Sequence, residues 1–223
     1  MKGYEVRVLH FAVLATLAGH SGMGEAVHVS PSGQGQVLIY PYYTVRGGYN
    51  TLITVINTQN NTKAVKVRFL EGKYSREVLD FNLFMSPNDV WTSAVVATAN
   101  GARLISNDNS CVLPNDLFTE TRTDAQSLAP NELKNTQYTG ALTDSEAFAS
   151  LDRTREGYFE VIEMAVIDTT SSTGRSVAGF IQHNNAGIPA NCAALNNFEP
   201  TPGNTNQFRF PNVGGPRPAQ LHR

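Results

Sequence analysis

The sequence has almost no excess of charge of either sign. Its 223 residues include 17 Lys and Arg against 19 Asp and Glu, which gives a net charge of −2. A protein that binds nucleic acid or an anionic membrane surface needs a basic patch. The composition therefore gives no electrostatic argument for a nucleic-acid partner. The sequence also lacks a phosphate-binding glycine loop, a dinucleotide fingerprint and a haem attachment motif, so no organic cofactor is expected.

Cysteine is almost absent, and the two that occur are Cys111 and Cys192. Two thiols are too few for a structural zinc site, which takes four ligands. An even pair in an exported chain is better explained as a disulfide. We therefore predict a Cys111–Cys192 disulfide. It closes a loop of about 80 residues and contributes ~4 kcal/mol through the lower entropy of the unfolded chain.

The sequence lacks an apolar run long enough to span a bilayer. Residues 8–18 form a short apolar segment that follows Lys2 and Arg7, and residues 24–26 (GEA) place small residues at a cleavage site. This is the pattern of a secretory signal peptide, and a buried helix or membrane anchor fits it less well. We predict a signal peptide over residues 1–26. The mature protein is then expected to be secreted, periplasmic or at the cell surface, without a membrane span.

Short apolar runs separated by turn residues are what the chain does contain. In the run 64–72, Val65, Val67 and Phe69 point to one side while Lys66 and Arg68 point to the other. This period of two is typical of half-buried strands, and Gly, Asn and Pro between the runs favour turns. The pattern predicts an antiparallel sandwich or barrel. The expected strands are residues 36–45, 51–58, 64–72, 77–85, 89–96, 102–105 and 157–167.

The spacing of the predicted strands divides the chain into segments. We predict a β-sandwich domain over residues 27–198, with Trp91 as a core anchor between sheets. An insertion over residues 107–155 is expected to hold long loops and short helices. Residues 199–223 are rich in Pro and Gly and are predicted to be a tail or linker. Smaller predictions are a helical piece at 144–153, a turn at 171–174 and a short helix around Cys192.

The first two predicted strands differ in their expected positions. Pro41 interrupts the first strand, and proline is tolerated in a sheet at an edge or a bulge, so we expect this strand to lie at an edge or to switch sheets there. Tyr40, Tyr42 and Tyr43 place rings on both of its faces, and packing is favoured over a ligand platform. Together with Pro41 they form the candidate interaction edge. Residues 51–58 have apolar side chains on both faces, which predicts a central strand covered on both sides.

The search for catalytic residues identifies none. His183 is the one histidine away from the chain ends, and no G-x-S-x-G motif presents a serine to it, so an ordinary loop residue is favoured over a catalytic base. Glu160 and Glu163 fall on opposite faces of one strand and are poor candidates for a carboxylate pair. Residues 107–110 (NDNS) offer oxygen ligands for Ca²⁺, but an Asx-rich turn is the favoured interpretation.

Part of the pattern has known counterparts. The runs YPYYTV, TLITVINT, KAVKVRFLEG and DFNLFMSPNDVW resemble a group of secreted bacterial proteins of uncharacterised function. They are also similar to immunoglobulin-like sandwiches of bacterial surface proteins. The resemblance covers the first half of the mature chain. It implies an all-β, antiparallel immunoglobulin-like β-sandwich, export and an interaction role, and it implies no catalytic residue.

The leading hypothesis is an exported, non-enzymatic protein that acts as a cell-surface, matrix or adhesion component. Its expected partner is a protein or a glycan at the cell surface, bound by strand addition at the Pro41-interrupted edge or through loops. Association with further copies into a homo-oligomer is left open. The alternatives are a carbohydrate-binding module and a secreted hydrolase with His183 in its site. The module would use exposed tyrosines drawn from Tyr40, Tyr42, Tyr43, Tyr49 and Tyr74.

Overall fold

The computed structural model describes residues 30–119, 123, 127–135, 150–170, 172–197 and 208–209. Residues 1–35 and 36–223 form two separate compact units. Of the first unit only residues 30–35, a polar turn, are described. The predicted signal peptide, most of the predicted helical piece at 144–153 and most of the predicted tail therefore lie outside the described residues. The rest of this section concerns residues 36–223.

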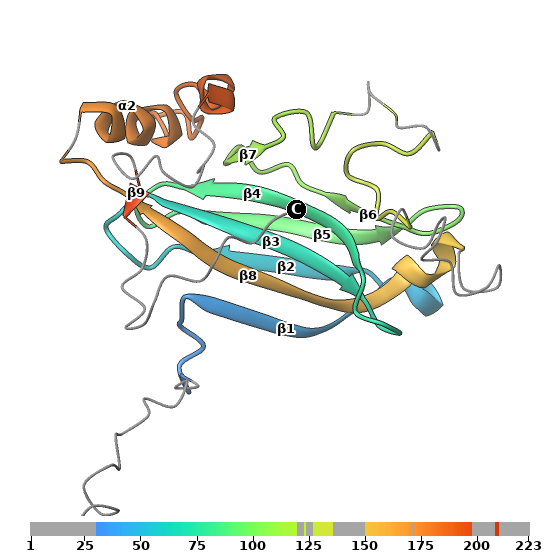
Figure 1. Ribbon diagram of the computed structural model, residues 1–223. Coiled ribbons are helices and arrows are strands. Elements are labelled where there is room, and N and C mark those ends of the chain that lie inside the picture. Colours follow the sequence, from blue (N-terminus) through green and yellow to red (C-terminus); the bar gives the residue numbers. More distant parts are fainter. Residues whose placement is uncertain are drawn as a thin grey trace, which may run out of the picture. The chain divides into compact units, whose positions relative to one another are not determined.

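This unit is built from two antiparallel sheets (Figure 1). The larger sheet has the order β1-β8-β3-β4-β7, and a short strand β9 also pairs with β8. Its members are β1 (Val37–Thr44), β8 (Glu156–Ile167), β3 (Lys63–Glu71), β4 (Glu77–Met85), β7 (Cys111–Leu113) and β9 (Phe208–Arg209). The smaller sheet has the order β2-β5-β6 and consists of β2 (Thr51–Ile56), β5 (Val90–Ala97) and β6 (Ala102–Ile105).

The two sheets enclose the main hydrophobic core. Alternate side chains of each strand point inward, so that Val67 and Phe69 of the larger sheet meet Val55 and Val95 of the smaller sheet in one buried cluster. Trp91 is fully buried in this cluster and its ring centre lies 5.7 Å from that of Phe81, which confirms its prediction as a core anchor. The all-β character and the antiparallel pairing are likewise as predicted from the alternation.

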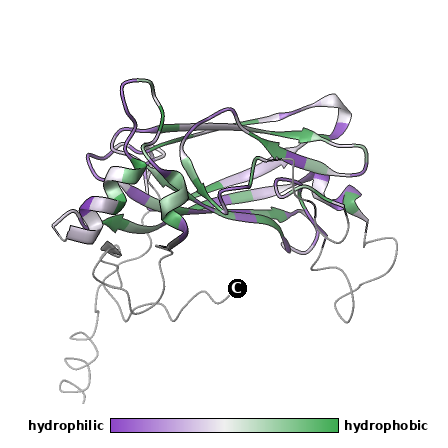
Figure 2. Cartoon of the chain, turned by 90° about the horizontal axis from the view of Figure 1, so that it is seen from above, coloured by the Kyte–Doolittle hydropathy of each residue, from purple (hydrophilic) through white to green (hydrophobic). Residues whose placement is uncertain are grey.

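A second, smaller core lies on the other face of the larger sheet. Helix α2 (Ser172–Ile181, orange in Figure 1) and the 3₁₀ turn η6 (Cys192–Asn197) cover this face with Val177, Ile181 and Leu195. Hydrophobic colour accordingly lies along the strands and on α2 in Figure 2, while hydrophilic colour gathers in the connecting turns. The predicted disulfide is present here, because the Sγ atoms of Cys111 and Cys192 are bonded and join β7 to η6.

Two expectations from the sequence are wrong. Residues 172–174 of the predicted turn at 171–174 belong to α2, which begins at Ser172. The strand β2 is not a central strand covered on both sides. It stands at the end of the order β2-β5-β6, with Ile53 buried but Leu52 83% exposed. Apolar residues on both faces thus marked a strand with one face in the core and the other at the surface.

One lateral side of the sandwich is closed by a connecting segment. Residues 131–133 run along the outer edge of β6, where Leu104 donates its N–H to the carbonyl of Asn131 and Leu133 donates to Ala102. The next residue, Lys134, donates its N–H to the carbonyl of Val78 in the larger sheet. The edges of β1 and β2 lie on the opposite side, linked by a hydrogen bond from the Tyr40 hydroxyl to the carbonyl of Thr54.

Candidate functional site

The predicted edge strand β1 does stand at an edge. Among the described strands it is the last of the larger sheet and pairs with β8. Its register shifts between Tyr40 and Tyr43, so that Pro41 and Tyr42 together oppose the single residue Tyr158. Pro41 therefore sits at a β-bulge of an edge strand, as expected for a residue without a backbone N–H.

The alternation of hydrogen bonds shows which backbone groups of β1 point away from the sheet. Gln36 accepts a hydrogen bond from the N–H of Glu163 in β8 at 2.7 Å. In an antiparallel ladder alternate residues bond to the same neighbour, so Leu38 and Tyr40 also face β8. Val37 and Ile39 therefore direct their N–H and C=O groups outward, and their side chains are 54% and 65% exposed. Pro41 ends this open stretch because it has no N–H to offer.

The structure separates the predicted edge residues. Tyr43 is buried and its hydroxyl donates to the carbonyl of Thr154 at 3.1 Å. The ring of Tyr40 stacks on Phe159 with centroids 4.2 Å apart, and burial raises the pKa of its phenol. Pro41 and Tyr42 remain at the surface. Sequence reasoning missed Val37 and Ile39, although strict alternation with the inward-facing Leu38 would have placed both on the outer face.

The exposed tyrosines lie in different surroundings. Tyr42 and Tyr49 are exposed near Arg46, at the connection between β1 and β2. Arg46 pairs with Asp152 at 2.9 Å and with Glu156 at 3.0 Å, and Glu156 is 3.5 Å from the Tyr42 hydroxyl.

These ion pairs also shift the pKa values of two side chains. The hydrogen bond between Arg46 and Asp152 lowers the pKa of the Asp152 carboxyl and raises that of the Arg46 guanidinium.

Tyr74 lies elsewhere, at the turn after β3, with the Arg153 guanidinium 5.1 Å from its ring centre. The five tyrosines considered from the sequence thus do not form one platform.

His183 has polar neighbours from the turn between β4 and β5. Its Nδ1 lies 3.0 Å from the hydroxyl of Ser86 and 3.8 Å from the carboxylate of Asp89. A Ser-His-Asp triad needs the serine and the carboxylate on opposite ring nitrogens, so that one orients the ring while the other exchanges the proton. Here both face the same nitrogen, and Ser86 is buried. The arrangement ties the loop after α2 to the β4–β5 turn and does not present a nucleophile.

Three carboxylates of the larger sheet are engaged in ion pairs. Glu160 lies 3.6 Å from Arg68, and Asp80 pairs with Lys66. Glu163 pairs with Lys63. Each of these carboxylates is neutralised by a basic side chain of β3, so the structure brings no two of them together as an acid and a base.

The NDNS segment forms a hydrogen-bonded turn. Asp108 accepts from the N–H and the hydroxyl of Ser110 with one oxygen and from the N–H of Thr92 with the other. Its carboxylate therefore has protein donors at both oxygens. Within the described ranges no group of three or more His, Cys, Asp and Glu side chains could hold a metal ion.

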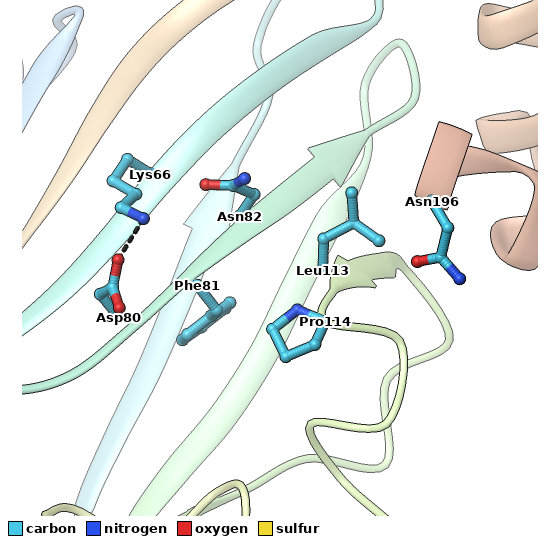
Figure 3. A pocket seen from close by; sticks show the side chains of 7 residues that line it. All are labelled: Lys66, Asp80, Phe81, Asn82, Leu113, Pro114 and Asn196. Carbon is cyan, nitrogen blue, oxygen red and sulfur yellow. Dashed lines mark ion pairs between the residues drawn. The ribbon is translucent and has the colours of Figure 1, made fainter. Parts of the chain in front are cut away.

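A shallow groove of about 270 Å³ lies on the outer face of the larger sheet (Figure 3). Its polar lining consists of the Lys66–Asp80 ion pair and the amides of Asn82 and Asn196, while Leu113 and Pro114 supply apolar surface. The ion pair cancels the charge that a ligand could use. The volume also falls below the range of about 300–1,000 Å³ that is usual for ligand sites. The predicted edge residues Tyr40, Pro41, Tyr42 and Tyr43 do not line this groove.

Comparison with known proteins adds no further constraint, because no protein family, no curated protein and no solved structure matches the chain. The intramolecular disulfide indicates an oxidising compartment, as found outside the cytosol. In the part of the chain that the structure describes, no helix is both long and apolar enough to cross a membrane.

Proposed function

We propose that this protein is exported and acts without catalysis, as an immunoglobulin-like sandwich component of a cell surface, matrix or adhesion system. Two antiparallel sheets around a shared core are what such a sandwich requires. The disulfide supports export, because disulfides persist in oxidising compartments. The observation that carries the proposal is the open edge of β1, where Val37 and Ile39 expose both backbone groups and apolar side chains.

Binding at this edge takes place by strand addition. An extended segment of a partner lies beside β1 and pairs with the outward N–H and C=O groups of Val37 and Ile39. Successive residues of the added strand point to opposite faces. On one face they meet the exposed side chains of Val37 and Ile39. On the other they meet Leu38 and Tyr40, which lie half-buried at the rim of the core.

Pro41 sets the length and the chemistry of the segment. An added strand loses its donor at Pro41, and the bulge there turns the backbone away from a regular ladder. The paired stretch is therefore short and covers residues 36–40. Because the open stretch presents apolar side chains on both faces, the favoured partner is an uncharged, apolar extended segment. Proline and the bulge also protect the remainder of β1 from indiscriminate pairing.

The test uses the organism that produces the protein. Deleting the gene should reduce adhesion or matrix assembly, and the wild-type gene should restore it. A variant with Val37→Lys and Ile39→Lys should fail to restore it although the protein is made and folded, because lysine on an edge strand blocks pairing. Labelling of intact cells with an impermeant reagent should find the protein outside the cytoplasm.

A matched control separates edge pairing from a general effect of added charge. Ile188 is also exposed and lies in the loop after α2, outside β1. Ile188→Lys should restore adhesion fully. Full restoration by the β1 double variant would remove the edge from the mechanism. A protein found only in the cytoplasm would overturn the proposal as a whole.

A glycan partner is the second candidate, and it is favoured by one observation. Tyr42 is exposed with its hydroxyl 3.5 Å from Glu156, and Tyr49 is exposed directly after the 3₁₀ turn that carries Arg46. Exposed aromatic rings near charged hydrogen-bonding groups suit sugars. A glycan array with the folded, oxidised protein tests it directly. Binding that is lost in Tyr49→Ala but kept in the β1 double variant would replace strand addition with sugar recognition.

A further inference from the structure

The outer face of the smaller sheet is an apolar surface that the function proposed above does not use. On β2, β5 and β6 the residues that alternate with the core residues point outward. Leu52, Ile56, Val90 and Ile105 are exposed on this face, and Leu52 is the most exposed of them. The complete face, which we name the β2-β5-β6 face, consists of Leu52, Thr54, Ile56, Val90, Thr92, Ala94, Val96, Arg103 and Ile105.

The register of the strands makes this face contiguous. Leu52 lies opposite Ala94, and Ala94 lies opposite Ile105, which gives one apolar row across the three strands. Ile56 lies opposite Val90 and gives a second apolar row. Directly opposed side chains are about 5 Å apart, so the members of a row touch or nearly touch. A contiguous exposed apolar surface of this kind marks an interaction site.

Charge on the face favours a partner that is itself uncharged. Arg103 is the one ionisable side chain among its residues, and it lies at one end, opposite Val96. A strongly charged partner would find no counter-charge here beyond that of Arg103. Two copies of the face would meet without opposing like charges at their centre. The face is thus complementary in charge to itself.

The order of the rows is also complementary to itself. Thr54 lies opposite Thr92, and this threonine row separates the Leu52 row from the Ile56 row. A two-fold axis along the threonine row places the Leu52 row of one copy on the Ile56 row of the other, and it places threonine on threonine. An isologous contact of two identical patches is the usual arrangement in homodimers.

We propose that the β2-β5-β6 face is a contact between two copies of this chain, which pack through it sheet on sheet. The area buried in this contact limits how tightly two copies associate. Three strands about 4.8 Å apart and about six residues long cover on the order of 300 Å² in each copy. Two copies bury roughly 600 Å², about half of the 1,200 Å² at which stable interfaces begin. The contact is therefore transient in dilute solution and becomes effective where many copies are held close together.

Sedimentation equilibrium of the folded, oxidised chain tests the proposal. The average mass should rise towards twice the monomer mass between about 10 µM and about 1 mM, as expected for an interface of this size. Leu52→Asp should weaken the association by roughly tenfold or more, because it buries an unpaired charge in the contact. Ile188→Asp, at another exposed site outside the face, should leave the association unchanged.

A cross-linking experiment locates the contact independently. Both native cysteines are in the disulfide, so Thr54→Cys introduces a single free thiol. Packed sheets lie about 10 Å apart, and a bismaleimide of about that span should join Thr54→Cys chains into dimers. Ile188→Cys should give none.

Three outcomes would overturn the proposal. The first is a chain that stays monomeric at 1 mM. The second is an association that Leu52→Asp leaves intact, since it would lie on another surface such as the β1 edge. The third is a Leu52→Asp variant that unfolds much more readily than the wild type. That result would show that another segment of the same chain covers the face.

Discussion

The guanidinium of Arg153 lies 3.1 Å from the carboxylate of Glu71, and both side chains are buried, at 3% and 0% exposure. Glu71 ends strand β3, and Arg153 belongs to the 3₁₀ turn η5 (Leu151–Arg155) that precedes β8. Glu71 also accepts hydrogen bonds from the backbone N–H groups of Lys73, Tyr74 and Arg76. One carboxylate therefore fixes the turn between β3 and β4 and attaches η5 to it.

Breaking this ion pair should destabilise the fold strongly. Glu71→Gln removes the carboxylate that pairs with the buried Arg153, and removal of one partner of a buried pair costs about 3–5 kcal/mol. Urea denaturation of both proteins measures the difference. Glu77→Gln is the control, because Glu77 pairs with Arg68 at a partly exposed site and its loss should cost about 1 kcal/mol or less. Equal effects of the two substitutions would contradict the role given to Glu71.

The same carboxylate should make stability depend on pH. Burial by itself raises the pKa of Glu71, but the three backbone N–H groups and Arg153 outweigh burial, and the net pKa is lowered. The contribution is therefore complete above the pKa of about 4.3 in the unfolded chain, and it is lost as the pH falls through the lower folded value. The stability difference between wild type and Glu71→Gln should be constant above about pH 5 and should shrink below about pH 4. A difference that grows on acidification would contradict it.

Loss of the disulfide should destabilise the second core. Cys111 and Cys192 are 81 residues apart in sequence, and opening a loop of that length costs ~4 kcal/mol in the chain-entropy account. A double variant with Cys111→Ala and Cys192→Ala should therefore unfold at a lower urea concentration than the oxidised wild type. Adding a reducing agent should lower the midpoint of the wild type and leave that of the double variant unchanged. A wild type insensitive to reduction would show that α2 and η6 hold this end without the bond.

Two glycines give opposite predictions for the same substitution. A Cβ on Gly157 would overlap the carbonyl oxygen of Leu70 and lie 2.9 Å from the Cα of Glu71, because β8 passes close to β3 there. Gly157→Ala should cost about 1–3 kcal/mol or more. Gly179 lies within α2 with nothing near its Cβ position, so Gly179→Ala should stabilise by about 0.5–1 kcal/mol. Thermal unfolding of both variants checks the pair, and the same sign for both would contradict it.

The strands were predictable from the sequence because their signal is local. Alternation places β3, β4 and β8 within a residue of their bounds, and Pro41 correctly indicates an edge strand with a bulge. The start of α2 was missed because residues 171–174 (SSTG) have weak helix propensity, and packing of Val177 and Ile181 on the sheet stabilises this helix instead.

The arrangement of the site was not predictable, because it depends on contacts between residues far apart in sequence. Nothing local links Ser86 to His183 or Glu71 to Arg153. The apolar pattern of the β2 sequence is clear, but it fits two different positions in a sheet. Apolar residues on both faces are equally consistent with a strand covered on both sides and with a surface strand such as β2, whose outer side chain Leu52 is exposed.

The pairing of β1 and β9 with β8 has a mechanical consequence. Both run antiparallel to β8, β1 beginning beside Glu163 and β9 ending opposite Val166. The backbone at Gln36 and the backbone at Arg209 therefore meet β8 three residues apart, at a separation of roughly 10 Å. A pulling force applied through these two points passes across a short length of β8. Most of the sandwich then bears no load and stays folded while the chain is pulled at these two points.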